Sequence, residues 1–382
     1  MGLVRSKFNY DVVMLISIAL LVVIGIVMIY SASSYKAQSA YNDSHYFLKN
    51  QIKRVLIGLL LLILAMKIDY HLLLKASPFM LGLAFVLLIY VLIDPTDSLL
   101  KGSRRWIEIK GMMFQPSEFA KFSLIFFLAS FLSRKEDVLD DFMNGLLPAL
   151  LVIGLIVVPV LVEPNMGTTV ILLLISATML FVAGARAKHL GILALSTLGV
   201  ILLFVKNMQY QKARFLMFID TLLDARQPVW QVKQSMISLG NGGFFGVGLG
   251  NSKQKLHFLP QPFTDFIYSI IGEELGFIGA AFIAALFIIL MLRGIRSAVR
   301  APDREGMFLA IGITFSVTYY FLINAGVATN LLPITGIPMP FISYGGSSLI
   351  MTMFAIGILL NVSAQANTAI APVRLNRRVK RR

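Results

Sequence analysis

Long apolar runs alternate with short polar stretches through most of this chain of 382 residues. A helix that crosses a membrane needs about 20 mostly apolar residues. Two of the runs are short and need their flanking residues to span. The pattern predicts an all-α integral membrane protein, with one polytopic domain over residues 1–382 and ten spans centred on residues 12–30, 55–66, 79–93, 119–132, 146–162, 168–183, 190–205, 266–292, 307–325 and 348–362.

Composition agrees with this class, since 57% of the residues are hydrophobic and only 14% are charged. The net charge is nevertheless +15, which suits anionic membrane lipids or an anionic substrate. Cysteine is absent, which excludes disulfides, thiolate metal sites and cysteine nucleophiles. The four histidines match no metal-binding spacing, so we expect no histidine metal site, and no nucleic-acid partner is expected.

The distribution of Lys and Arg places both termini in the cytoplasm. Residues 206–265 then form an extracytoplasmic loop, and residues 363–382 form a basic cytoplasmic tail. The outer segments keep many cations, which either snorkel to lipid headgroups or build a surface that holds an anion. The glycine-rich "SLGNGGFFGVGLGNSKQK" lacks a nucleotide-loop ending and predicts tightly folded or re-entrant backbone. The uncharged "LLPITGIPMPFISYGGSS" is expected to dip into the protein.

Three carboxylates mark the eighth predicted span. Asp265 stands at its outer mouth, while Glu273 and Glu274 lie inside the apolar run. In a continuous helix, Asp265, Ser269, Gly272 or Glu273, and Gly276 share one face, with Glu273 about 12 Å deeper than Asp265. That face must look into the bundle or a water-filled cavity. We interpret Glu273 and Glu274 as polar anchors in the bundle interior, paired with donors or partly protonated.

A second polar segment, "FQPSEFAKF", opens the fourth span. Pro116 suits the first helical turn, Glu118 suits the positive helix end, and Lys121 is close enough in sequence to pair with Glu118. Two interpretations stay open. Lys121 is either a snorkelling lysine on a capped helix, or it faces the same cavity as Asp265 and holds a phosphate.

A third segment, "KGSRRWIEIKG", joins Arg104 and Arg105 to Trp106. Tryptophan is common at membrane interfaces, but arginines also bind diphosphates and sugars stack on such rings. Taken together, the carboxylate, cations and aromatic ring suit glycosyl transfer from a lipid diphosphate donor. They equally suit a carrier that binds an anionic lipid.

Several phrases, among them "MIYSASS", "FQPSEFAKF", "EPNMGTT", "TDFIYSIIGEELGFIG" and "GIPMPFISYGGSSLIM", closely resemble the SEDS family, the FtsW/RodA/SpoVE glycosyltransferases of bacterial cell-wall synthesis. The resemblance implies a multi-pass enzyme that polymerises lipid II on the outer face of the bacterial cytoplasmic membrane. It also implies a class B penicillin-binding protein as partner, with other divisome or elongasome membrane proteins. "YSASS" and "PFISYGGSS" favour the FtsW/SpoVE branch over the RodA branch.

The family's essential aspartate falls on Asp265, which the resemblance makes a general base that deprotonates the acceptor sugar hydroxyl. Undecaprenyl diphosphate then leaves with inversion at the anomeric carbon. No firmly bound cofactor is expected, although a divalent cation, Mg²⁺ or Mn²⁺, is compatible with the reaction. Asn50 replaces a usual arginine, which shifts the expected donor-side cation to Arg54 or Lys53. The candidate substrate-binding residues are Trp106, Arg105, Lys121, Glu118, Arg54, Lys53, Lys255 and Ser343.

Two alternatives belong to other functional classes. A lipid II flippase, or another transporter of lipid-linked precursors, would place its ionisable residues near the membrane midplane. Asp265 is instead expected at the outer mouth, which favours the enzyme. A scaffold of a division complex without activity of its own is the third possibility.

Overall fold

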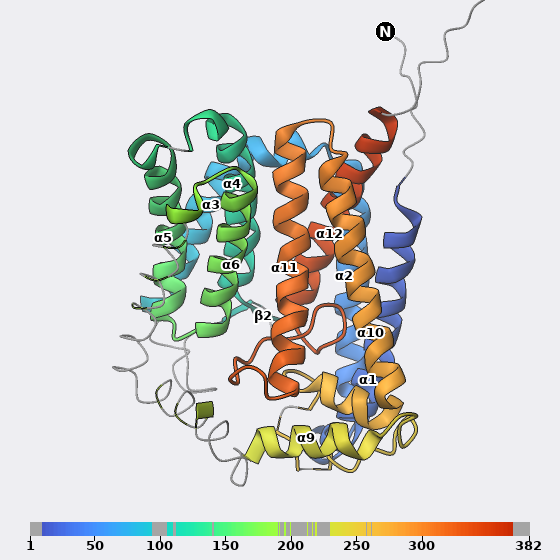
Figure 1. Ribbon diagram of the computed structural model, residues 1–382. Helices are drawn as coiled ribbons and strands as arrows, with labels where there is room; N and C mark the ends of the chain where they lie inside the picture. Colours follow the sequence, from blue (N-terminus) through green and yellow to red (C-terminus); the bar gives the residue numbers. More distant parts are fainter. Residues whose placement is uncertain are drawn as a thin grey trace, which may run out of the picture.

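The computed structural model describes residues 10–93, 105–109, 112–139, 141–189, 230–256, 258–260 and 262–369, with a few single positions between 191 and 219. Most of this chain is helical, and the long helices form one bundle (Figure 1). Its α-helices are α1 (Val12–Tyr41), α2 (Tyr46–Lys67), α3 (Tyr70–Ile93), α4 (Pro116–Lys135), α5 (Leu147–Val162), α6 (Met166–Val182), α9 (Trp230–Gly242), α10 (Ile267–Val299), α11 (Arg304–Ala328) and α12 (Gly346–Ala369). A 3₁₀ turn (Glu136–Val138) and a π turn (Phe142–Leu146) lead into α5.

Local sequence signals explain several helix ends. The Asp11 side chain accepts a hydrogen bond from the Met14 N–H (3.1 Å) and caps α1, while Asn42 closes that helix in the left-handed conformation. Pro116 occupies the first turn of α4, as expected. The Asp303 side chain caps α11 by accepting from the Gly306 N–H (2.7 Å). These caps satisfy backbone groups that each helix leaves unpaired.

Nine of the ten predicted spans fall on α1 to α6 and α10 to α12, and the seventh lies outside the described residues. Within the described ranges, six helical segments are long and apolar enough to cross a membrane: α1, α3, Phe142–Val162, α10, α11 and Gly346–Ala366. The second and fourth spans extend into charged flanks, as predicted. The chain is therefore an all-α membrane protein, while the count of ten spans stays a prediction.

Close contact between α2 and α12 shows why small residues occupy this interface. A Cβ atom added to Gly357 would lie 2.4 Å from the Leu62 carbonyl oxygen, and one added to Gly58 would lie 2.5 Å from the Met353 sulfur. Glycine lets the two helices approach closely, which is how helices commonly associate inside membranes. Among the six helices that could span a membrane, α11 and α12 are the most buried.

The eighth predicted span differs from expectation because α10 is broken at Gly276, where φ is 69° and ψ is −168°. The prediction of a continuous helix over 266–292 is wrong at this point. Glu273 precedes the break, so the depth assigned to it stays a prediction. Glycine accepts this positive φ without the steric cost of a side chain. The break divides α10 into a short first segment beside α9 and a long second segment that continues through the bundle (Figure 1).

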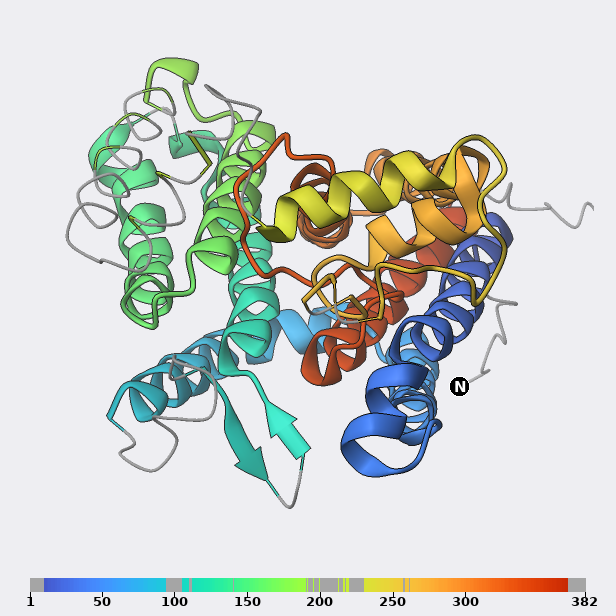
Figure 2. The ribbon, with the colours of Figure 1, turned by 90° about the horizontal axis from the view of Figure 1, so that it is seen from below.

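Two elements were not predicted. Residues Ile107–Ile109 (β1) and Met112–Phe114 (β2) form an antiparallel hairpin at the side of α4, and α9 lies across one end of the bundle (Figure 2). The second half of the last loop, residues 337–343, is buried in the protein as predicted, with Ile337, Met339 and Ile342 at most 4% exposed, whereas Leu331 in its first half is 75% exposed.

Candidate functional site

Asp265 lies in the turn that precedes α10, and its side chain is half-buried. The Asn324 side-chain amide, on α11, donates to the Asp265 carbonyl oxygen (2.9 Å) and to the Ile337 carbonyl oxygen (2.7 Å). One buried amide therefore fixes the Asp265 turn against the last loop. The carboxylate lies beside Gly336, since a Cβ atom added there would be 3.6 Å from Asp265 Oδ2.

Ser343 joins the same turn to the last loop. Its hydroxyl donates to the Thr264 carbonyl oxygen (2.6 Å) and accepts from the Met339 N–H (2.7 Å). Next to it, the Tyr344 N–H donates to the Phe263 carbonyl oxygen (2.8 Å). The structure thus brings together Asp265 and Ser343, two predicted site residues that are far apart in sequence.

Two cations border this turn. The Arg54 guanidinium lies over the Tyr344 ring, 4.3 Å from its centroid, and Lys36 Nζ is 5.4 Å from the Phe263 centroid. Arg54 Nη1 is buried and has no hydrogen-bond partner in the described part of the chain. Lys53 is exposed. Sequence reasoning missed Lys36, because the first span was predicted to end at residue 30 whereas α1 continues to residue 41.

Glu118 and Lys121 form a buried ion pair (2.7 Å) inside the bundle. Lys121 is 1% exposed, so the snorkelling interpretation is wrong. The Tyr320 hydroxyl donates to Glu118 Oε1 (2.8 Å), and its ring lies beneath Lys121 Nζ at 3.9 Å from the centroid. Tyr320 precedes Asn324 by about one turn of α11. The same helix therefore contacts both the ion pair and the Asp265 turn.

Arg105 and Trp106 lead into the β1–β2 hairpin, and both are half-buried. Arg105 donates to the carbonyl oxygens of Glu163 (Nε to O, 3.2 Å) and Pro164, which ties the hairpin to the α5–α6 connection. Glu163 itself is buried, and neither carboxylate oxygen has a hydrogen-bond partner among the described residues. Burial raises the pKa of Glu163 to about 8, and the Arg105 charge offsets only part of this rise.

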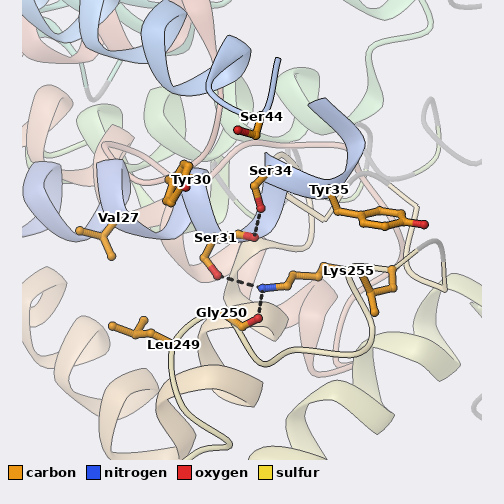
Figure 3. Close-up of a pocket in the computed structure, with 10 residues that line it drawn as sticks. Val27, Tyr30, Ser31, Ser34, Tyr35, Ser44, Leu249, Gly250 and Lys255 are labelled. Atoms are coloured by element: carbon orange, nitrogen blue, oxygen red, sulfur yellow. Dashed lines mark hydrogen bonds between the residues drawn. The ribbon is translucent and has the colours of Figure 1, made fainter. Parts of the chain in front are cut away.

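Lys255 belongs to a different cluster. Its ammonium donates to Glu274 Oε1 (2.8 Å), the Gly250 carbonyl oxygen (2.7 Å) and the Ser31 hydroxyl (3.1 Å). It borders a pocket of 530 Å³ between α1 and residues 249–256, with Ser31 and Gly250 beside it (Figure 3). All the hydrogens of the ammonium are thereby used within the protein.

The two glutamates of α10 are saturated with donors. Ser31 donates its hydroxyl to Glu274 at 2.6 to 2.7 Å, in addition to the Lys255 bond. Glu273 accepts from the hydroxyls of Ser238 (2.9 Å) and Ser252 and from the Lys253 N–H (3.1 Å). The interpretation of these glutamates as buried, paired anchors agrees with this geometry.

The Asp265 turn has the parts that an acid–base site needs: a half-buried carboxylate on fixed backbone, with cations nearby. Within the described residues, no group of three His, Asp or Glu side chains is placed to hold a metal ion. A loosely held divalent cation stays a prediction.

Comparison with known proteins fits this arrangement. The family model described as "Cell cycle protein" (FtsW/RodA/SpoVE) matches residues 11–368. The chain is 42% identical to a probable peptidoglycan glycosyltransferase FtsW from Geobacter sp. (strain M18), over 96% of this chain and 100% of that protein. It is 40% identical to the stage V sporulation protein E of Bacillus subtilis (strain 168), over 94% of this chain and 98% of that one.

Among solved structures, a chain from the work titled "Structural coordination of polymerization and crosslinking by a peptidoglycan synthase complex" superposes with a TM-score of 0.75. The identity is 26%, over 94% of this chain and 98% of that chain. The match extends over almost the full length of both, so the fold and the sequence agree on one assignment. The chain belongs to the FtsW/RodA/SpoVE family.

Proposed function

We propose that this peptidoglycan glycosyltransferase polymerises lipid II at the end of the bundle that holds Asp265. The enzyme class follows from relatives about 40% identical over nearly the whole chain that are named peptidoglycan glycosyltransferases. The reaction joins an acceptor sugar hydroxyl to the anomeric carbon of a glycan donor and releases undecaprenyl diphosphate with inversion. It needs a base for the hydroxyl proton and positive charge for the leaving group.

The observation that carries this proposal is the hydrogen-bonded junction of residues 263–265 with residues 343–344 and Asn324. It holds a half-buried carboxylate on rigid backbone, which a general base requires in order to meet a bound hydroxyl in one geometry. Asp265 would accept the acceptor proton as the glycosidic bond forms and the diphosphate leaves.

Arg54 is the cation best placed for the diphosphate. Its Nη1 is buried without a hydrogen-bond partner in the described ranges, and its guanidinium lies 3.5 Å from the Cβ position of Gly346. Gly346 begins α12, so the positive end of that helix adds to the positive electrostatic potential beside Arg54. Lys121 and Lys255 are already paired with carboxylates, so they would contribute to the site by stabilising the fold and not by binding the diphosphate.

The sidedness of the reaction is also part of the proposal. Arg293, Arg296, Arg300 and Arg304 gather where α10 meets α11, whereas Asn324 contacts the Asp265 turn near the other end of α11. Twenty helical residues separate Arg304 from Asn324, a rise of about 30 Å, which is the thickness of the hydrocarbon core. Positive charge marks the cytoplasmic side, so Asp265 would face outward, with both termini in the cytoplasm of a bacterium.

A class B penicillin-binding protein is the proposed partner. One structural neighbour comes from a peptidoglycan synthase complex that coordinates polymerisation with crosslinking. The enzyme would supply glycan strands that the partner transpeptidase crosslinks.

The test mixes the purified protein, its penicillin-binding partner and labelled lipid II in detergent. Glycan polymer should form with the wild-type protein and disappear with Asp265→Ala. Polymer that is unaffected by this substitution would rule out Asp265 as base. Movement of lipid II between leaflets of protein-containing liposomes, without polymer, would instead support a flippase.

A further inference from the structure

The glycine-rich loop after α9 exposes large apolar side chains at the end of the bundle. Phe244 is 58% exposed, Phe245 79% and Leu249 55%. No charged residue occurs between Lys233 and Lys253. An uncharged segment that presents aromatic rings outward is typical of a surface that meets lipid or another protein.

The backbone of this loop is held in place by the break in α10. The N–H groups of Phe277 and Ile278 donate to the carbonyl oxygens of Gly243 (2.9 Å) and Phe244 (3.3 Å). In return, the loop N–H groups of Val247 (2.9 Å) and Gly248 (3.0 Å) donate to the carbonyl oxygens of Glu273 and Glu274. The loop thus satisfies four backbone groups that the broken helix leaves unpaired.

Glycine is required where these two segments meet. A Cβ atom added to Gly246 would lie 2.3 Å from the Glu274 carbonyl oxygen, and one added to Gly276 would lie 2.3 Å from the Gly246 nitrogen. Both glycines also have positive φ angles. This junction fixes the backbone that carries the two phenylalanines.

The exposed rings adjoin the exposed apolar surface of α10. The Phe244 ring stacks on the Phe277 ring, with 5.7 Å between centroids and 26° between planes. Phe277 is 62% exposed, and further along the second segment of α10 the side chains of Phe282, Ile288 and Leu292 are exposed as well. Apolar side chains that are exposed on a helix long and apolar enough to cross a membrane face lipid. Figure 2 shows the loop after α9 at the edge of the bundle, beside α10.

A tryptophan strengthens the choice of lipid as the occupant of this surface. Trp230, at the start of α9, is 56% exposed and donates its indole N–H to the Phe258 carbonyl oxygen (3.0 Å). Exposed tryptophan is common at the depth of lipid headgroups. With α9 lying across the end of the bundle, this places the loop at the membrane surface (Figure 1).

We infer that residues 244–249 insert into the lipid leaflet at this end of the protein, with Phe244 and Phe245 among the acyl chains. The inserted loop is a second membrane anchor beside the spanning helices, and α9 transmits its position to the start of α10. The Ser238 hydroxyl donates to the Ser269 carbonyl oxygen (3.0 Å), and Ser235 bonds both the Ser269 hydroxyl and the Ala328 carbonyl oxygen (2.7 Å). These bonds join α9 to the first segment of α10, which begins two residues after Asp265.

The absence of cysteine from the chain makes a direct test simple. Single cysteines are introduced by Phe245→Cys, by Phe282→Cys as the lipid-facing reference and by Lys253→Cys as the water-facing reference. Each full-length variant is spin-labelled and reconstituted without other proteins into vesicles of phosphatidylethanolamine and phosphatidylglycerol. Collision rates with oxygen, which concentrates in lipid, and with a water-soluble nickel chelate are then measured.

The label at position 245 should show an oxygen-to-nickel collision ratio close to that at position 282 and several-fold above that at position 253. A ratio like that at position 253 would overturn the inference, because the loop would then lie in water. Low collision rates with both reagents would also overturn it, since a second copy of the chain would then cover the loop. Thermal unfolding of each labelled variant confirms that the compared proteins are folded.

Discussion

Asp265 and the Glu273–Glu274 pair stand near opposite ends of the first segment of α10, and their surroundings differ sharply. Asp265 is half-buried, and its turn is fixed through backbone carbonyls by Asn324 and Ser343. The two glutamates are about 1% exposed, and their carboxylates receive hydroxyl, backbone and ammonium donors. One region fixes the backbone around an acid, while the other neutralises the acids themselves.

The difference separates a chemical role from a structural one. A base must be able to exchange a proton with substrate, so the protein positions its backbone. A buried carboxylate with no substrate to meet needs every lone pair satisfied, because an uncompensated charge is costly in a low dielectric.

Removing one partner of the Lys255–Glu274 ion pair should destabilise the fold most. Lys255→Met leaves Glu274 buried without its cation and should lower the free energy of unfolding by about 3–5 kcal/mol. The double variant Lys255→Met/Glu274→Gln should recover much of this loss. Thermal unfolding in detergent measures both effects. A Glu274→Gln protein with wild-type stability but no polymerisation would contradict the structural role of this cluster, because Glu274 would then be needed for the reaction.

Arg54→Ala should reduce lipid II polymerisation by about 10²-fold, the usual effect of removing one group that stabilises developing negative charge. Thermal stability should change little, because Arg54 as a whole residue is half-buried and its Nη1 makes no hydrogen bond in the described ranges. Lys53→Ala, at the exposed neighbouring position, is the matched control and should retain activity. Equal losses in the two variants would show that general surface charge, not Arg54, serves the leaving group.

Ser343→Ala should lower kcat about tenfold, because the Asp265 turn loses one of its hydrogen bonds to the last loop and the base shifts. Ser347→Ala is a useful comparison, since Ser347 also makes two hydrogen bonds to backbone, at Met113 and Gln115. Both variants should lose about 1–3 kcal/mol of stability. If kcat falls equally in both, Ser343 has no special link to the base.

Glu163 provides a third kind of carboxylate, buried without a hydrogen-bond partner in the described ranges. Its pKa in the folded protein, about 8, lies above the ordinary value of 4.5. The contribution of Glu163 to the free energy of unfolding is therefore fully present below pH 4.5, and it is lost as the pH rises through 8. Glu163→Gln should therefore raise Tm at pH 8 by roughly 2–4 °C, with little gain at pH 5. A larger gain at pH 5 than at pH 8 would contradict the assigned burial.

Hydrophobic pattern was sufficient to locate helices at nine of the ten predicted positions, because long apolar runs have few alternatives in a membrane protein. Six of these helical segments are long and apolar enough to cross a membrane. It failed at Gly276, where the apolar run continues while the helix breaks. The missing information lay in a distant segment, since the loop after α9 supplies the hydrogen bonds that permit the break. The helical repeat of 3.6 residues describes contacts within one helix. It therefore carries no information about a partner loop that lies about 30 residues away in the sequence.

The candidate site was predicted unevenly for similar reasons. The sequence motifs pointed to Asp265 and Ser343, which the structure brings to one junction. Asn324 went unnoticed, because an asparagine inside an apolar span does not show which backbone it will hold. The spacing of Lys121 and Glu118 already allowed their ion pair, which the structure shows to be buried. The pair of Lys255 with Glu274 emerges only from packing, because the two residues come from separate segments.

The central claim is that Asp265 acts as the base, and steady-state kinetics of Asp265→Asn with lipid II test it most directly. Asparagine keeps the size of the side chain but does not accept the proton. We predict that kcat falls by about 10²–10⁴-fold while KM changes less than about threefold. An increase in KM with kcat unchanged would contradict the account, because Asp265 would then only bind substrate.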